Sequence, residues 1–138
     1  MIDFVNILLF LPDSRIVLQR RTKDAPTDPG LLGLFGGHVD PGEDPDSAMQ
    51  RELAEETSLE VEKMTLERID VFELSAEEVS KPKGERIFMY RTDIRDMNFS
   101  VFEGDRAECY TTIALLERND LAPGVARVIE KLFKTTDK

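Results

Sequence analysis

The stretch that most constrains the fold is a glycine-led acidic segment, GGHVDPGEDPDSAMQRELAEETSL, which runs from Gly36 to Leu59. A helix is predicted to begin in its middle. Asp44 can accept hydrogen bonds from free backbone N–H groups, and Pro45 supplies a backbone angle already suited to the first helical turn. The sequence therefore predicts a loop followed by a helix that ends near Thr57.

The predicted helix carries three glutamates on one face. Glu52, Glu55 and Glu56 share this face because residues three and four positions apart in a helix are neighbours. Like charges on one face repel each other, so the helix needs compensating positive charge, and divalent cations bound by carboxylate oxygens supply it. We therefore expect a site for Mg²⁺ or Mn²⁺ here. The alternative interpretation is an ordinary acidic face in contact with water.

The spacing of the segment resembles the signature of the Nudix hydrolases, the MutT-like nucleoside diphosphate-X hydrolases. The chain matches this signature at Gly37, Glu43, Arg51, Glu52, Leu53, Glu55, Glu56 and Leu59. Ser58 stands where the family usually has glycine, a residue suited to a left-handed helix end. We therefore expect about 1 kcal/mol of local strain at Ser58, or a shifted helix end. No carboxylate of the signature is missing.

The resemblance implies an α/β fold, namely an α/β/α sandwich with a central mixed β-sheet. It also implies that Glu55 and Glu56 bind the metal directly and that Glu52 binds the metal or orients a water molecule. In this family the carbonyl just before the first glycine of the signature also points at the metal. That role falls to Gly36 in this chain.

The resemblance further implies that two residues hold the metal ligands in place. Arg51 is expected to pair with Glu43 or with a neighbouring ligand, and Gly37 is expected to support the ligands with them. We count Arg51 among the catalytic candidates on this ground.

A further acid from outside the signature often assists in this family. Glu103, Asp105 and Glu108 are the candidates, because they lie on or beside a predicted loop that precedes a strand. The sequence does not choose among them, and all three could be loop acids in contact with water.

A basic group follows the second predicted strand. Arg20, Arg21 and Lys23 are candidate substrate-binding residues that could contact a phosphate or a base at the mouth of the site. The alternative is a strand end in contact with water. His38 is the only histidine, so a zinc site or a histidine-based catalytic triad is not expected.

The rest of the chain predicts mainly strands followed by a terminal helix, an order that agrees with the α/β/α sandwich. Strands are predicted at 2–11, 15–20, 31–35, 59–61, 66–74, 85–92, 99–102 and 108–113, with glycines 36 and 37 following the third strand as a loop. Helices are predicted at 114–119 and from 120–123 onward, and polar loops at 22–30 and 75–84.

Length, charge and cysteine usage bound the function. The 138 residues suit one domain over 1–138, and the net charge of −10 argues against a nucleic-acid partner. We expect a small phosphorylated nucleotide-type substrate and no membrane partner, since the apolar run at 5–11 is too short to span a bilayer. The sequence leaves a homodimer open. Cys109 is the only cysteine, which excludes an internal disulfide and predicts a cytoplasmic protein.

The expected function is a metal-dependent pyrophosphohydrolase in which water attacks phosphorus and cleaves the diphosphate linkage of a nucleoside diphosphate derivative. One alternative is a Nudix-fold module that binds a nucleotide without hydrolysing it. Another is an isomerase of the isopentenyl diphosphate type, which would need Cys109. Markers that ADP-ribose and dinucleoside polyphosphate hydrolases tend to show, a proline near 74–75 and a tyrosine near 76–77, are missing. Nucleoside triphosphates, including oxidised ones, and nucleotide sugars stay open.

Overall fold

The computed structural model describes residues 1–134, and within them a seven-stranded mixed sheet has the strand order β3-β2-β1-β6-β5, with β4 paired to β1 and β7 to β2. Its strands are β1 Ile2–Phe10, β2 Ile16–Arg20, β3 Leu32–Gly33, β4 Phe35–His38, β5 Glu67–Leu74, β6 Glu85–Asp93 and β7 Arg106–Tyr110. Only the β1–β6 pair is parallel among these strands; the other pairs are antiparallel.

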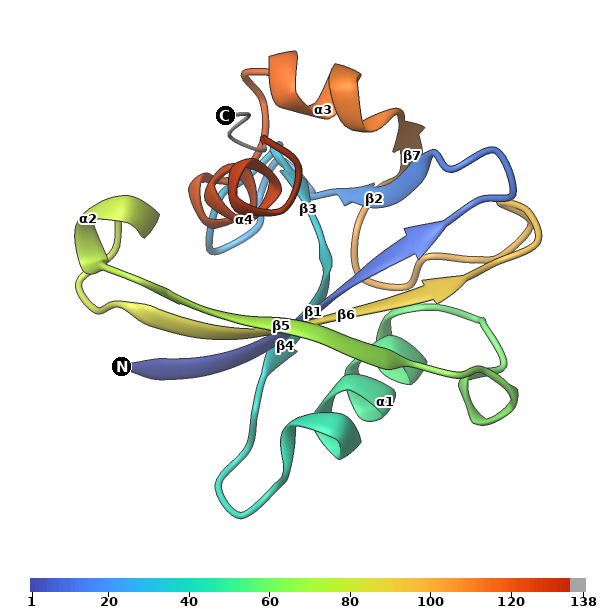
Figure 1. The fold of residues 1–138 in the computed structure, drawn as a ribbon, viewed down its shortest axis with the longest axis horizontal. Coiled ribbons are helices and arrows are strands. Elements are labelled where there is room, and N and C mark those ends of the chain that lie inside the picture. Colours follow the sequence, from blue (N-terminus) through green and yellow to red (C-terminus); the bar gives the residue numbers. More distant parts are fainter. Residues whose placement is uncertain (135–138) are drawn as a thin grey trace.

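Helices cover both faces of the sheet (Figure 1). They are α1 Pro45–Glu56, α2 Ala76–Val79, α3 Thr112–Glu117 and α4 Pro123–Phe133, with a 3-10 turn η1 at Val61–Lys63. In the described part of the chain, no helix combines the length and the apolar composition needed to cross a membrane.

Successive side chains of β1 point to opposite faces of the sheet, and both faces are buried. Val5, Ile7 and Leu9 join one buried cluster with Met49 of α1. Leu8 points to the opposite face, into the cluster that contains the buried side chains of α2, α3 and α4. A central strand covered on both faces is apolar throughout, as this one is. The predicted α/β/α sandwich with a mixed sheet is confirmed.

Several predicted elements are wrong, and the strand expected at 108–113 ends at Tyr110 because α3 begins at Thr112. The strand expected at 59–61 is replaced by η1, whose Val61 packs under α1. The segment at 99–102 forms only an isolated bridge, between Val101 and Thr57. The polar stretch at 75–84 contains the short helix α2, because Ser75 and Glu78 cap each other through side chain and backbone.

Of the two outcomes expected at Ser58, local strain or a shifted helix end, the strain does not occur, because Ser58 is not among the residues with a positive φ. Helix α1 ends in extended backbone at Thr57, with φ −140°, and the Thr57 hydroxyl donates to the Leu53 carbonyl over 2.8 Å. Ser58 then exchanges two hydrogen bonds with Ser100: its N–H donates to the Ser100 carbonyl, and its hydroxyl oxygen accepts from the Ser100 N–H. No left-handed residue is needed where the chain leaves the helix this way.

Candidate functional site

Two glycines allow α1 to lie close against β4, and they belong to this strand rather than to the loop predicted for them. A Cβ at Gly37 would lie 2.5 Å from the Glu52 carboxylate. Gly36 has φ +150°, and a Cβ there would lie 1.9 Å from the Val5 carbonyl oxygen. The Gly36 N–H donates to Glu56 Oε1 over 2.9 Å. Bare backbone at Gly37 therefore makes room for the Glu52 carboxylate, and bare backbone at Gly36 lets β4 pair closely with β1.

The carboxylates lie in an environment that disfavours their ionisation. Glu56 is only 4% exposed, and burial raises its pKa to about 9, against the opposing hydrogen bond from Gly36. The charges of Glu52 and Glu103 raise this pKa further. Burial also raises the pKa of Glu52, while Arg51 opposes that rise. Buried like charges of this kind retain a proton until a cation compensates them.

Arg51 organises the acidic face of α1. It donates from Nε and Nη2 to both carboxylate oxygens of Glu43, over 2.8 and 2.9 Å. Its Nη1 donates to Glu52 over 3.1 Å and to Glu55 over 3.3 Å, and Nη2 also donates to the His38 carbonyl. The hydrogen bond from Arg51 lowers the pKa of Glu43 to about 2. The structure thus pairs Arg51 with Glu43, and the guanidinium holds Glu52 and Glu55 as well.

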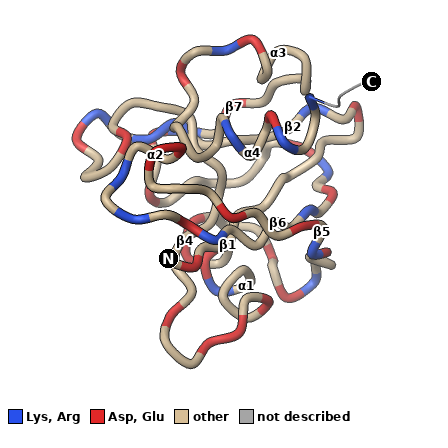
Figure 2. Tube along the Cα trace, turned by 60° about the vertical axis from the view of Figure 1, so that its left-hand side comes forward, with Lys and Arg blue, Asp and Glu red and all other residues tan. Residues whose placement is uncertain are grey.

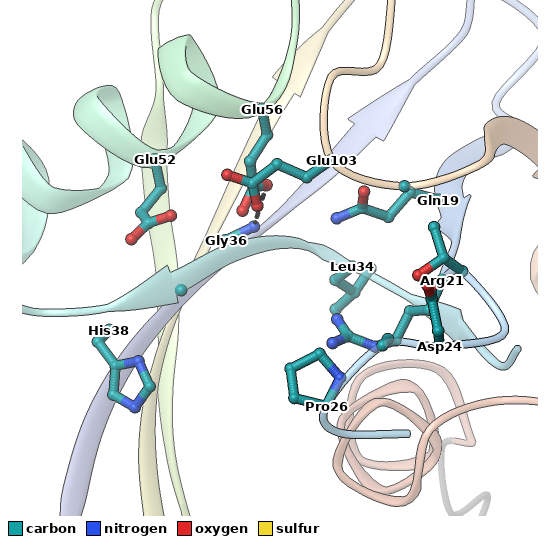
Figure 3. Close-up of a pocket in the computed structure, with 14 residues that line it drawn as sticks. Gln19, Arg21, Asp24, Pro26, Leu34, Gly36, His38, Glu52, Glu56 and Glu103 are labelled. Carbon is teal, nitrogen blue, oxygen red and sulfur yellow. Dashed lines mark hydrogen bonds between the residues drawn. The ribbon is translucent and has the colours of Figure 1, made fainter. Parts of the chain in front are cut away.

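A cleft of about 540 Å³ opens beside these carboxylates (Figure 3). Its lining consists of Gln19, Arg21, Thr22, Asp24, Ala25, Pro26, Leu34, Gly36, Gly37, His38, Glu52, Glu56, Glu103 and Gly104. Of the three candidate acids outside the signature, Glu103 lies in this lining, whereas Asp105 and Glu108 do not. The structure therefore brings Glu103, and not the other two, to Glu52 and Glu56.

Arg20 and Glu108 lie away from the cleft and bind each other. Arg20 donates to both oxygens of Glu108, over 3.0 and 2.8 Å, and to Asp120 over 3.0 Å. The Arg20 side chain is 15% exposed, and its hydrogen bond lowers the pKa of Glu108 to about 2. The structure thus does not place Arg20 at the cleft as a substrate ligand, nor Glu108 there as an acid. Both charges are already neutralised inside the fold.

The other basic candidates differ in position. Arg21 lines the cleft, and Thr27 holds its guanidinium through the backbone carbonyl over 2.7 Å and the hydroxyl over 3.1 Å. Lys23 is exposed and outside the lining. Cys109 also lies outside it, on β7, where its sulfur accepts a hydrogen bond from Arg15.

Gln19 is a lining residue that belongs to no motif in the sequence. It is 5% exposed, and its Oε1 has no hydrogen-bond partner within residues 1–134. A polar residue inside an otherwise apolar strand was the available signal, because a buried amide needs partners.

No three His, Cys, Asp or Glu side chains within the described residues form a ready-made metal site. The position of Glu55 is consistent with this result, because its side chain is 52% exposed and contacts Arg51. The carboxylate groups that line the cleft offer oxygen atoms only, the donors preferred by Mg²⁺ and Mn²⁺. Figure 2 shows that acidic residues also gather along α1 and the loop before it.

The fold and this carboxylate cleft define an α/β protein of the Nudix type. A model of the NUDIX domain matches residues 3–132, and the chain belongs to that family. The MutT protein from Methanosarcina mazei Go1 has a similar structure, with a TM-score of 0.81, 19% identity and coverage of 99% of this chain and 96% of that one.

Two relatives are similar in sequence over part of their length. The RNA pyrophosphohydrolase of Caulobacter vibrioides is 47% identical over 55 residues, which are 40% of this chain and 31% of that protein. The asymmetrical bis(5'-nucleosyl)-tetraphosphatase of Mus musculus is 29% identical over 86 residues, 62% of this chain and 57% of that protein. The match thus spans about a third of the first relative and less than two thirds of the second.

Proposed function

We propose that this chain is a divalent-metal-dependent pyrophosphohydrolase that cleaves the diphosphate linkage of a small nucleoside diphosphate derivative by water attack on phosphorus. The observation that carries the proposal is the cleft that Glu52, Glu56 and Glu103 line together, with Glu56 bound to the Gly36 N–H. The pKa of the buried Glu56 carboxyl is raised to about 9, so at neutral pH the group is either protonated or paired with a cation. The complete set of Glu52, Glu55 and Glu56 weighs against a module that binds a nucleotide without hydrolysing it.

The carboxylates of the cleft fit a hard cation because they offer oxygen atoms. Glu52 and Glu56 would hold it together with the carbonyl of Gly36, whereas Glu55 lies outside the cleft lining and would have to turn away from Arg51 to join them. When bound, Mg²⁺ or Mn²⁺ neutralises phosphate oxygens and lowers the pKa of a water molecule.

Other residues of the chain would accept the proton, orient Glu52 and bind the phosphates. Glu103 lies beside Glu56 in the cleft (Figure 3) and would accept the proton of the attacking water at its carboxylate. Arg51 keeps Glu52 oriented through its hydrogen bond of 3.1 Å. Arg21 would bind a phosphate oxygen at the cleft wall, with Lys23 as a further contact at the mouth.

The substrate is proposed to be a small nucleotide rather than a nucleic acid. The net charge of −10 disfavours a long polyanion, whereas a single phosphorylated ligand needs only local positive charge. The two relatives carry different substrate names, so neither name is transferred to this chain. A cytoplasmic location belongs to the same proposal.

The test is a panel of nucleoside triphosphates, oxidised triphosphates, nucleotide sugars, ADP-ribose, dinucleoside tetraphosphates and 5'-triphosphorylated RNA. Release of phosphate or pyrophosphate is measured with Mg²⁺ and with excess chelator. We expect turnover of at least one small nucleotide with Mg²⁺ and none with chelator. Tight nucleotide binding without turnover would favour a binding module. Turnover that persists in chelator, or that is confined to RNA, would contradict the proposal.

A further inference from the structure

The side chain of Gln19 is buried in the wall of the cleft without a hydrogen-bond partner for its oxygen. It lies on β2, is 5% exposed, and its Oε1 finds no donor within residues 1–134. Leaving a buried acceptor unpaired costs free energy, and the great majority of such atoms in folded proteins are paired. Packing alone would be served as well by an apolar side chain of the same length.

The loop that carries Glu103 holds this amide in place. A Cβ at Gly104 would lie 2.7 Å from Gln19 Oε1 and 2.8 Å from the Arg20 carbonyl oxygen, so only bare backbone fits over the amide. The Asp105 N–H donates to the same Arg20 carbonyl over 2.9 Å and fixes the loop on β2. The amide is thereby confined between strand and loop before any ligand arrives.

The amide points into the space that Glu56 and Glu103 also face (Figure 3). Its nitrogen is turned towards the carboxylates, and rotation about the last side-chain bond exchanges nitrogen and oxygen. A ligand that brings a hydrogen-bond donor would favour the orientation in which Oε1 faces the cleft. Ionised phosphate oxygens only accept hydrogen bonds, so they cannot satisfy this atom.

We propose that Gln19 is a specificity-determining residue that accepts a hydrogen bond from the nucleoside part of the substrate. The donor is a sugar hydroxyl or an N–H group of the base. This inference rests on the proposed function, because it supposes a nucleotide in the cleft. It assigns recognition of the nucleoside to Gln19, whereas the carboxylates and Arg21 act on the cation and the phosphates.

The test compares the parent protein with Gln19→Met, which keeps the side-chain length and removes both polar atoms. Thr92→Val is the matched control, since Thr92 is another buried polar strand residue, 6% exposed, and lies outside the cleft lining. Substrates that the parent hydrolyses are paired with 2'-deoxy and 3'-deoxy analogues and with analogues lacking a base amino group. Inhibition by inorganic tripolyphosphate reports on phosphate contacts alone.

We expect Gln19→Met to raise KM about tenfold for nucleotides that carry the donor, with less than a twofold change for the analogue that lacks it. The analogue series shows whether sugar or base supplies the donor. Tripolyphosphate inhibition and the Mg²⁺ dependence should stay unchanged. The melting temperature should be equal or higher, because an unpaired buried acceptor is removed.

Several results would overturn the inference. An equal loss on every nucleotide together with weaker tripolyphosphate inhibition would make Gln19 a phosphate contact. A changed Mg²⁺ dependence without changed discrimination would assign the amide to the cation. Unchanged kinetics, or a melting temperature several degrees lower, would leave it a structural residue. If the parent hydrolyses nothing, calorimetric nucleotide binding gives the same comparison, so failure of the proposed activity is distinguishable from failure of this inference.

Discussion

Replacing Glu56 by glutamine should separate stability from activity, and the pKa of Glu56 gives the size of the effect. The folded protein holds this proton up to a pKa of about 9, whereas an ordinary glutamate releases it near 4.5. Between these values the folded state binds more protons than the unfolded state, so stability falls as pH rises. The slope from one proton is about 1.4 kcal/mol per pH unit.

At pH 7 the loss in the free energy of unfolding has reached about 3 kcal/mol. This is an upper value, because Glu52 and Glu103 share the repulsion. Glutamine cannot ionise, and its amide oxygen can still accept the hydrogen bond from Gly36. Metal-free Glu56→Gln should therefore be more stable than the parent at pH 7 by up to about 3 kcal/mol. Its turnover should fall by orders of magnitude, because the proposed cation ligand has lost its charge.

The measurement is urea unfolding in chelator at pH 6, 7, 8 and 9, for the parent, Glu56→Gln and Glu62→Gln. Glu62 is an exposed residue of η1 outside the cleft lining and controls for loss of one carboxyl group. The stability difference between the parent and Glu56→Gln should widen as pH rises, and the control should follow the parent. Parallel curves, or a Glu56→Gln protein that unfolds below the parent with its activity intact, would refute the reasoning.

Three further substitutions have distinct expected outcomes. Glu43→Gln weakens the two hydrogen bonds to Arg51, so thermal melting should show lower stability and initial rates at saturating Mg²⁺ should fall by about 10–100-fold; an unchanged melting temperature and rate would contradict this. Cys109→Ser should change the hydrolysis rate less than twofold, because the thiol lies outside the cleft lining; a loss above tenfold without unfolding would revive a cysteine-based mechanism. Arg20→Met leaves the half-buried Glu108 carboxylate without its main partner, so urea unfolding should show a loss of about 2–4 kcal/mol with KM nearly unchanged; a raised KM at unchanged stability would make Arg20 a substrate ligand after all.

The features that the sequence predicts well depend on contacts between residues close in the chain. Asp44 caps α1 by accepting from the Ser47 N–H over 2.9 Å, and Pro45 is the first helical residue, as its type and position predict. Arg51 meets Glu43 eight positions earlier, because the loop before α1 folds back on it. Local spacing therefore fixes the acidic face and its supporting arginine.

The features that the sequence does not predict depend on contacts between distant segments. Arg20 is taken up by Glu108 and Asp120, which lie 88 and 100 positions later. Nothing in the sequence around a basic residue at a strand end identifies such distant partners. The burial of Gln19 likewise depends on Gly104, which reaches it only after the loop before β7 folds across β2. The same fold selects Glu103 over its two acidic neighbours.

Binding of Mn²⁺ to the metal-free protein at pH 7, measured by titration calorimetry in buffers of different ionisation enthalpy, tests the central claim most directly. The cleft holds a proton on Glu56 that a cation must displace, since carboxylate ligands bind metals in the ionised form. We expect binding with release of about one proton in the parent and in Glu62→Gln, and weak binding without proton release in Glu56→Gln. Equal affinity and equal proton release in all three proteins would show that the carboxylate cleft is not the metal site.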